Sequence, residues 1–203
     1  MLRVALGQAR RAVGDRVVPI RDWHPDFAFT HVLHFVTEAL GHLPTYQGFR
    51  DFTRNDPIGR AMLYSPAEDA IAAATAAGYS RPDAAEAMRW RIGNAYYSFV
   101  REVHVLAYLR HHGIDVRVHP LADALFRADA WTGDTVVSLY VGNEKFRQGT
   151  QGRKPPAHSV LSDALPPFDF LSLELPTVRR FGVVHLAAEE RLAAAVAKLR
   201  STT

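Results

Sequence analysis

The sequence predicts an α/β fold, α+β in strict terms, with a mixed central sheet of about five strands flanked by helices. Two observations point to it. Apolar residues recur at helical spacing as far as residue 112, and from Ile114 they alternate with polar ones. We therefore expect one domain over residues 1–203, in which residues 1–80 form a mostly helical extension and residues 81–203 form the α/β core.

The N-terminal elements are expected to be helices. A helix over 26–40 is predicted by apolar residues at helical spacing and by Gly41 at its C-terminal end. The segment 44–55 mixes aromatic and polar residues and is expected to be an irregular connection. A second helix is predicted to begin at the capping sequence Ser65-Pro66-Ala67-Glu68 and to reach Ala77.

A long amphipathic helix opens the core. Ser80 and Asp83 form a second capping signal, and the helical pattern continues to His112, where Gly113 suits the C-terminal end. Its buried stripe is expected to contain five apolar residues, Met88, Ile92, Ala95, Phe99 and Leu106.

Five strands and a closing helix follow the long helix. The first strand is predicted over 114–118, and a hairpin over 125–131 and 135–141 turns at Thr132-Gly133-Asp134. The last two strands are expected over 168–175 and 181–186, and the closing helix over 187–199.

The composition is that of an ordinary globular protein. Of 203 residues, 48% are hydrophobic and 22% charged, and there is no cysteine, so thiolate metal sites and a cysteine nucleophile are excluded. No apolar run reaches the roughly 20 residues of a membrane span, and arginines interrupt the beginning of the chain. We expect a cytoplasmic protein with no signal peptide and no membrane partner, and the oligomeric state, including a homodimer, is left open.

Two carboxylates are candidate metal ligands. Glu102 lies about 60° from Phe99 around the long helix and is expected to be partly buried, while Asp129 is expected near the end of the first hairpin strand. A buried carboxylate must pair with a cation, bind a metal or raise its pKa. The alternatives are that Glu102 forms a salt bridge with Arg117 or Arg127, and that Asp129 pairs with Arg127 or begins the turn.

A basic loop follows the second hairpin strand. Glycines and prolines mark residues 143–160 as a loop, and its arginines, lysines and amide groups suit the backbone of a nucleic acid. The candidate nucleic-acid-binding residues are Asn143, Arg147, Arg153 and Lys154.

The order of helix glutamate, strand, hairpin aspartate, second hairpin strand, basic loop, strand and helix resembles the PD-(D/E)XK, or restriction-endonuclease-like, superfamily over residues 83–199. The resemblance implies a restriction-endonuclease-like fold and a Mg²⁺- or Mn²⁺-dependent nuclease that hydrolyses phosphodiesters of DNA or another nucleic acid. It further implies that Glu102 and Asp129 bind the metal and that Lys145 orients the attacking water.

The second hairpin strand departs from the family motif. Ser138, Leu139 and Tyr140 stand where the family has Glu-x-Lys, and the nearest candidates are Glu144 and Lys145 at the strand's end. The alternative is therefore a catalytically inactive module of the same fold that binds nucleic acid or protein.

A third hypothesis is a small metal enzyme that uses histidines of the first helix. His31, His34 and Glu38 are spaced three and four residues apart on one helical face, a pattern that can bind zinc or another transition metal.

Overall fold

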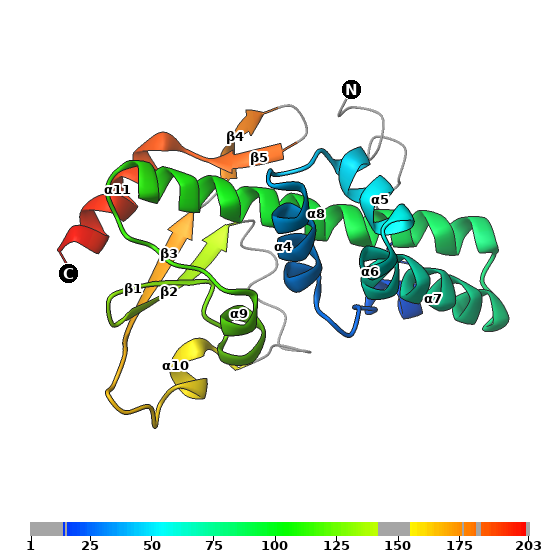
Figure 1. Cartoon of the computed structure of the whole chain (residues 1–203), viewed down its shortest axis with the longest axis horizontal. Helices are drawn as coiled ribbons and strands as arrows, with labels where there is room; N and C mark the ends of the chain where they lie inside the picture. The colour runs from blue at the N-terminus through cyan, green and yellow to red at the C-terminus, as the bar shows by residue number, and fades with distance from the viewer. Residues whose placement is uncertain (1–13, 15, 142–154, 176, 182–183, 202–203) are drawn as a thin grey trace. The chain divides into compact units, whose positions relative to one another are not determined.

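A computed structural model describes residues 14, 16–141, 155–175, 177–181 and 184–201 (Figure 1). The chain divides into two compact units, an N-terminal unit of Met1–Phe99 and a C-terminal unit of Val100–Thr203. Each unit is described below by itself, and the single-domain organisation stays a prediction. None of the described helices combines the length and the apolar character needed to cross a bilayer.

The N-terminal unit is helical, as predicted. Its elements are α3 (Val18–Arg21), α4 (Phe29–Leu40), α5 (Tyr46–Asn55), α6 (Pro57–Gly59), the π-helix η1 (Arg60–Tyr64), α7 (Ser65–Ala76) and the first part of α8 (Arg81–His111). Its core joins Val17 and Ile20 near α3 with small and aliphatic residues of α7 and α8, namely Ala67, Ile71, Ala74, Ala84, Ala87 and Met88.

The helix ends of this unit agree only in part with the capping signals. Gly41 ends α4 with a φ of 70°, as expected for a glycine there. Ser65 is not an N-cap, because η1 continues directly into α7 and the preceding backbone is already helical. The segment 44–55 is also not irregular: α5 begins after Thr45, whose Oγ1 accepts a hydrogen bond from the Gly48 amide at 3.1 Å.

Aromatic packing explains why α5 forms. Tyr46 and Phe49 lie one turn apart and are buried. The Tyr46 hydroxyl donates to the Arg89 carbonyl at 3.2 Å, and the Phe49 ring contacts that of Tyr96 at 5.8 Å between centroids. These aromatic residues are therefore the buried face of a helix rather than part of a loop.

The long helix is confirmed. The Asp83 amide donates to Ser80 Oγ at 3.2 Å, and Ser80 Oγ donates to the Asp83 carboxylate at 2.8 Å, so the predicted capping residues do cap α8. The helix runs to His111, and Gly113 follows with a φ of 80°. It contributes its N-terminal part to one unit and its C-terminal part to the other.

The C-terminal unit is built on a small mixed sheet. Strands β1 (Ala130–Thr132) and β2 (Thr135–Val141) form the predicted antiparallel hairpin, and β3 (Asp169–Leu175) pairs with β2 in parallel, from Thr135↔Asp169 to Val141↔Leu175. The remaining elements are α9 (Pro120–Phe126), α10 (Ala157–Val160), β4 (Thr177–Phe181), β5 (Val184–Ala187) and α11 (Glu189–Arg200).

The expected five-stranded central sheet is wrong, and with it the restriction-endonuclease-like fold. In the described part of the chain the main sheet has three strands in the order β1-β2-β3, whereas β4 and β5 pair only with each other. The predicted strand over 114–118 makes a single bridge, between Arg117 and Trp131. The chain is mostly helical, so only the α+β class is compatible with the prediction.

The predicted hairpin strand over 125–131 begins inside helix α9, which contains Leu125 and Phe126. His119 is its N-cap, and its Nδ1 accepts from the Leu121 amide at 3.1 Å, while Pro120 occupies the first helical turn. Proline suits that position because its missing N–H needs no partner there. Arg127 ends α9 in the left-handed region, with a φ of 59°.

One face of the sheet packs on α8 and α11. Val105 and Leu109 of α8, Leu192 and Leu199 of α11 and the inward residues of β2 and β3 form the core of the unit (Figure 1). Burial of these aliphatic side chains is the main stabilising contribution, at about 1.5–3 kcal/mol each.

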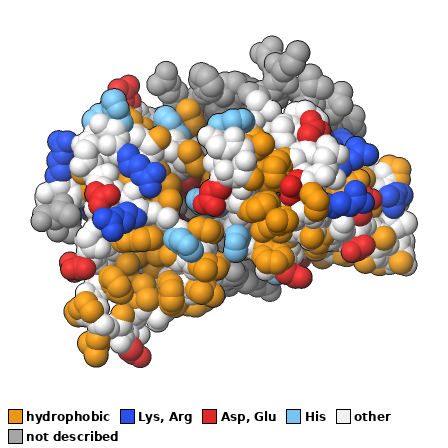
Figure 2. All heavy atoms as spheres, in the orientation of Figure 1, with side chains coloured by type: hydrophobic (Ala, Val, Ile, Leu, Met, Phe, Trp, Pro, Cys, Tyr) orange, Lys and Arg blue, Asp and Glu red, His pale blue; other side chains and the backbone are white. Residues whose placement is uncertain are grey.

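The opposite side carries α9 and α10. Ala122, Ala157 and Val136 pack together there. Figure 2 shows hydrophobic side chains gathered over this region, and the exposed ones include Leu121, Leu125, Phe126 and Val160.

Candidate metal-binding carboxylate site

Glu102 lies on α8 one turn before the buried residue Val105. Its side chain is half-buried, and this burial raises the pKa of the carboxyl to about 8. The negative charges of Asp129 and Asp123 raise it further, and the guanidinium of Arg101 opposes them. Glu102 and Asp129 are 27 positions apart in the sequence, but in the fold their carboxyl groups are within electrostatic reach of each other.

Asp129 is held by the backbone of the neighbouring strand. It precedes β1, and its Oδ2 accepts a hydrogen bond from the Leu139 amide at 2.6 Å. Strand β1 begins at Ala130, which pairs with Val137 of β2. Leu139 lies two residues further along β2, so no residue of β1 stands opposite its amide. The carboxylate of Asp129 therefore takes the place of a strand partner, and the hydrogen bond from Leu139 fixes its position.

The pKa of Asp129 is raised as well. Burial raises the pKa of Asp129 to about 6, and the hydrogen bond from Leu139 opposes this shift. The charge of Asp129 in turn raises the pKa of Glu102, so the two groups titrate as a pair, and burial favours their protonated forms in the metal-free protein.

Neither carboxylate forms the salt bridge with an arginine that the alternatives required, although the charge of Arg127 lowers the pKa of Asp129. In the described part of the chain, Arg117 pairs with Asp115 at 2.9 Å and Arg127 with Asp123 at 3.8 Å. No salt bridge among the described residues involves Glu102 or Asp129.

Arg101 adds an unused donor next to the pair. Its Nε is buried and has no hydrogen-bond acceptor among the described residues. Burial lowers the pKa of its guanidinium, and the charge of Glu102 partly restores it. A buried donor without an acceptor costs about 1–3 kcal/mol, which an anionic ligand could recover.

Carboxylate oxygens are ligands that Mg²⁺ accepts. Across the described residues there is no group of three or more His, Asp or Glu side chains placed to hold a metal. Mg²⁺ keeps several water ligands and is commonly bound by one or two carboxylates plus substrate phosphates, so a carboxylate pair is a sufficient protein contribution.

The predicted loop residues lie outside the described part of the chain. These are Asn143, Glu144, Lys145, Arg147, Arg153 and Lys154. On β2 itself, Leu139 is buried in the core, and its amide rather than a side chain serves the site through Asp129.

The histidines of α4 contact aromatic rings. His34 meets the Phe99 ring edge-on at 5.1 Å between centroids, and His31 meets Phe27 at 6.0 Å. Glu38 is exposed, and these three side chains form no metal-holding group within the described residues.

Two residues near the pair escaped sequence reasoning. Asp123 was missed because it lies between the predicted strands over 114–118 and 125–131, where no element was predicted, although His119-Pro120 is a helix-start signal. Arg101 was missed because adjacent positions on a helix point in different directions, so its proximity to Glu102 carried no signal.

Comparisons of the chain with protein-family models, with curated proteins and with solved structures find no match.

Proposed function

We propose that this protein is a divalent-metal-dependent phosphodiester hydrolase that acts on nucleic acid, with Glu102 and Asp129 as metal ligands. The observation that carries the proposal is the half-buried carboxylate pair, in which the charge of Asp129 raises the pKa of Glu102. Folding brings two like charges within electrostatic reach of each other without a salt bridge to either among the described residues, an arrangement that a divalent cation would stabilise.

The chemistry follows from the residues around the pair. A bound Mg²⁺ would polarise a phosphoryl oxygen and lower the pKa of a coordinated water. Asp129 is ready to bind because its position is fixed by Leu139, and Glu102 must release its proton first. Arg101 can donate to a phosphate oxygen from its buried Nε.

The loop residues complete the proposal. Lys145 is assigned the orientation of the attacking water, and Asn143, Arg147, Arg153 and Lys154 are assigned contacts with the phosphate backbone. These assignments come from the sequence, since all five residues lie outside the described part of the chain.

The test is cleavage of labelled single- and double-stranded DNA and RNA in Mg²⁺, Mn²⁺ or EDTA. Glu102→Gln and Asp129→Asn keep the side-chain shape and remove the charge, and each is expected to lower metal-dependent cleavage at least a hundredfold. Glu190→Gln, an exposed carboxylate on α11, is the matched control and should cleave like the unaltered protein.

Metal binding gives a second readout of the same site. Mn²⁺ affinity measured by titration calorimetry should rise between pH 6 and pH 8, because the proton on Glu102 competes with the ion. Salt-dependent nucleic-acid binding without cleavage, unchanged by Asp129→Ala, would replace the hydrolase proposal with the inactive binding module.

A further inference from the structure

Two arginines of the N-terminal unit lie over the ring of one tyrosine. The guanidinium carbon of Arg60 is 5.1 Å from the centre of the Tyr64 ring, and that of Arg54 is 5.8 Å from the same centre. Arg54 belongs to α5, whereas Arg60 and Tyr64 are the two ends of the π-helix η1. Both arginines are exposed, and π-helical turns occur frequently at functional sites.

The close packing of η1 against α5 brings the two arginines together. Gly59 is buried directly before η1, and a Cβ atom there would lie 3.2 Å from the Phe52 ring of α5, so only glycine fits this approach without a shift. The Asp56 carboxylate accepts a hydrogen bond from the Gly59 amide at 2.8 Å, which fixes the turn between the two helices. The fold itself therefore holds Arg54 beside Arg60.

No carboxylate of the described residues pairs with either arginine. Neither Arg54 nor Arg60 forms a salt bridge with any of them. The nearest acids along the chain have other partners: the Asp51 carboxylate accepts from the Gln47 side chain at 2.8 Å, and that of Asp56 caps the turn before η1. A guanidinium that lies over a ring uses its face for that contact, so the N–H donors in its plane remain available to an anion.

Arg50 extends the positive charge by one helical turn. Its guanidinium carbon lies 5.9 Å from the centre of the Tyr46 ring, and its side chain is exposed. Because Arg50 and Arg54 are four residues apart on α5, they lie on the same face, with their Cβ atoms about 5–6 Å apart. Arg50 likewise forms no salt bridge among the described residues. Arg50, Arg54 and Arg60 together are called the arginine patch.

We propose that the arginine patch binds the phosphate backbone of a nucleic acid. A guanidinium donates paired hydrogen bonds to phosphate oxygens, and a nucleic-acid strand presents its phosphates in a regular row to arginines that lie one helical turn apart. Since tyrosine rings already orient these side chains, less side-chain freedom is lost when the ligand binds. The choice of a nucleic acid rests on the proposed function, whereas the preference for phosphate rests on the arginines themselves.

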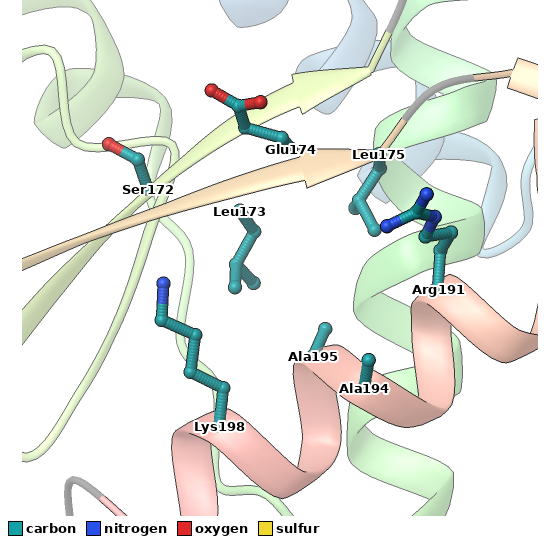
Figure 3. A pocket seen from close by; sticks show the side chains of 8 residues that line it. All are labelled: Ser172, Leu173, Glu174, Leu175, Arg191, Ala194, Ala195 and Lys198. Atoms are coloured by element: carbon teal, nitrogen blue, oxygen red, sulfur yellow. The ribbon is translucent and has the colours of Figure 1, made fainter.

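The pocket between β3 and α11 of the C-terminal unit supplies a matched control (Figure 3). It is lined by Arg191 and Lys198 of the helix together with Glu174 of the strand, so its lining carries both signs of charge. Replacing Arg191 and Lys198 by glutamine removes the same charge as replacing Arg54 and Arg60, and leaves the arginine patch intact.

The test is the binding of labelled single- and double-stranded oligonucleotides, followed by fluorescence anisotropy in EDTA so that metal-dependent cleavage does not interfere. At about 0.15 M salt, where exposed charges are screened beyond about 8 Å, Arg54→Gln/Arg60→Gln should weaken binding at least tenfold. The slope of log affinity against log salt concentration should fall by about 1.4–1.8, because each lost phosphate contact removes about 0.7–0.9. Arg191→Gln/Lys198→Gln should leave both the affinity and the slope close to those of the unaltered protein.

Three results would overturn the proposal. The first is oligonucleotide binding that is absent, or that is the same in Arg54→Gln/Arg60→Gln as in the unaltered protein. The second is an equal loss in Arg191→Gln/Lys198→Gln, which would show an effect of total charge. The third is displacement of the oligonucleotide, at matched ionic strength, by an equal concentration of inorganic phosphate or of a glutamate peptide, which would assign the arginine patch to that anion.

A folding defect does not prevent the test. If circular dichroism shows that Arg54→Gln/Arg60→Gln does not fold, the single variants Arg54→Gln and Arg60→Gln decide, each with a fall in the salt slope of about 0.7–0.9. A slope unchanged in both single variants would overturn the proposal as well.

The arginine patch and the hydrolase site fail separately. Binding in EDTA does not need the metal, whereas cleavage in Mg²⁺ that is lost with Glu102→Gln does. Binding that depends on Arg54 and Arg60 without any cleavage would keep the arginine patch and remove the hydrolase. Cleavage together with binding that ignores both arginines would keep the hydrolase and remove the arginine patch.

Discussion

At the scale of single residues, the pair of Glu102 and Asp129 costs the metal-free protein stability. Burial and the neighbouring charge raise the pKa of Glu102 from an ordinary 4.5 to about 8, and burial raises that of Asp129 from 3.8 to about 6. The folded state therefore binds protons that the unfolded chain has released. Such a strained pair is a common property of functional sites, where stability is exchanged for reactivity.

The pH dependence of stability follows with a definite sign. Because the folded-state pKa values lie above the unfolded ones, stability is greatest below about pH 4 to 4.5 for these groups and falls as the pH rises to about 8. In EDTA, Glu102→Gln should stabilise the protein at pH 8 by roughly 1–3 kcal/mol and have little effect at pH 5. Urea unfolding at both pH values measures this difference.

Glu190→Gln is the matched control for that experiment, since its carboxylate is exposed on the same unit. A stabilisation by Glu102→Gln that is the same at pH 5 and pH 8 would contradict the raised pKa.

At the scale of elements, the hydrogen bond between Asp129 and Leu139 ties the chain before β1 to the second half of β2. Asp129→Ala leaves the Leu139 amide without this acceptor and is expected to cost about 1–3 kcal/mol. Asp129→Asn retains an acceptor oxygen and should cost much less. Hydrogen exchange followed by NMR should show faster exchange of the Leu139 amide in the alanine variant only.

Asp134→Ala, in the turn of the same hairpin, separates this effect from general weakening of the hairpin, because its side chain is exposed. Equal protection of the Leu139 amide in the Asp129→Ala and Asp129→Asn variants would contradict the role of the carboxylate oxygen.

Elements with strong local signals were predictable from the sequence, and those that depend on distant partners were not. The capping residues Ser80 and Asp83 fix the start of α8, and Gly133 with a φ of 52° marks the hairpin turn. In contrast, the alternation of residues 114–118 is also what a short extended segment with one buried face requires. Among the described residues this segment pairs only through Arg117.

The candidate site shows the same division. Glu102 stood out because a carboxylate beside the apolar stripe of a helix is rare, and that reasoning needs only helical periodicity. Asp129 was found through a predicted strand over 125–131 that begins in α9 and ends in β1, so the residue was identified but its surroundings were not. The amide of Leu139 leaves no trace in the sequence, because its availability depends on where β1 begins.

At the scale of the whole molecule, α8 is the element that the two hydrophobic cores share. Ala84, Ala87 and Met88 belong to the core of the N-terminal unit, and Val105 and Leu109 to that of the C-terminal unit. A helix transmits order along its length because each residue adds one hydrogen bond to an existing turn. We therefore expect the two cores to unfold together, which is also what the single-domain prediction requires.

Asn94→Pro tests this coupling, since Asn94 is an exposed residue of α8 between the two sets of core residues. Proline inside a helix costs about 3 kcal/mol and breaks the hydrogen-bond ladder, so urea unfolding should change from one transition to two. Trp23 and Trp90 report on the N-terminal unit and Trp131 on the C-terminal unit, so variants that keep only one set of tryptophans distinguish the two transitions by fluorescence.

Asn94→Ala is the control and should unfold in one step. Two transitions in the unaltered protein would show that α8 does not couple the cores, and a single one in Asn94→Pro would show that contacts other than the helix couple them.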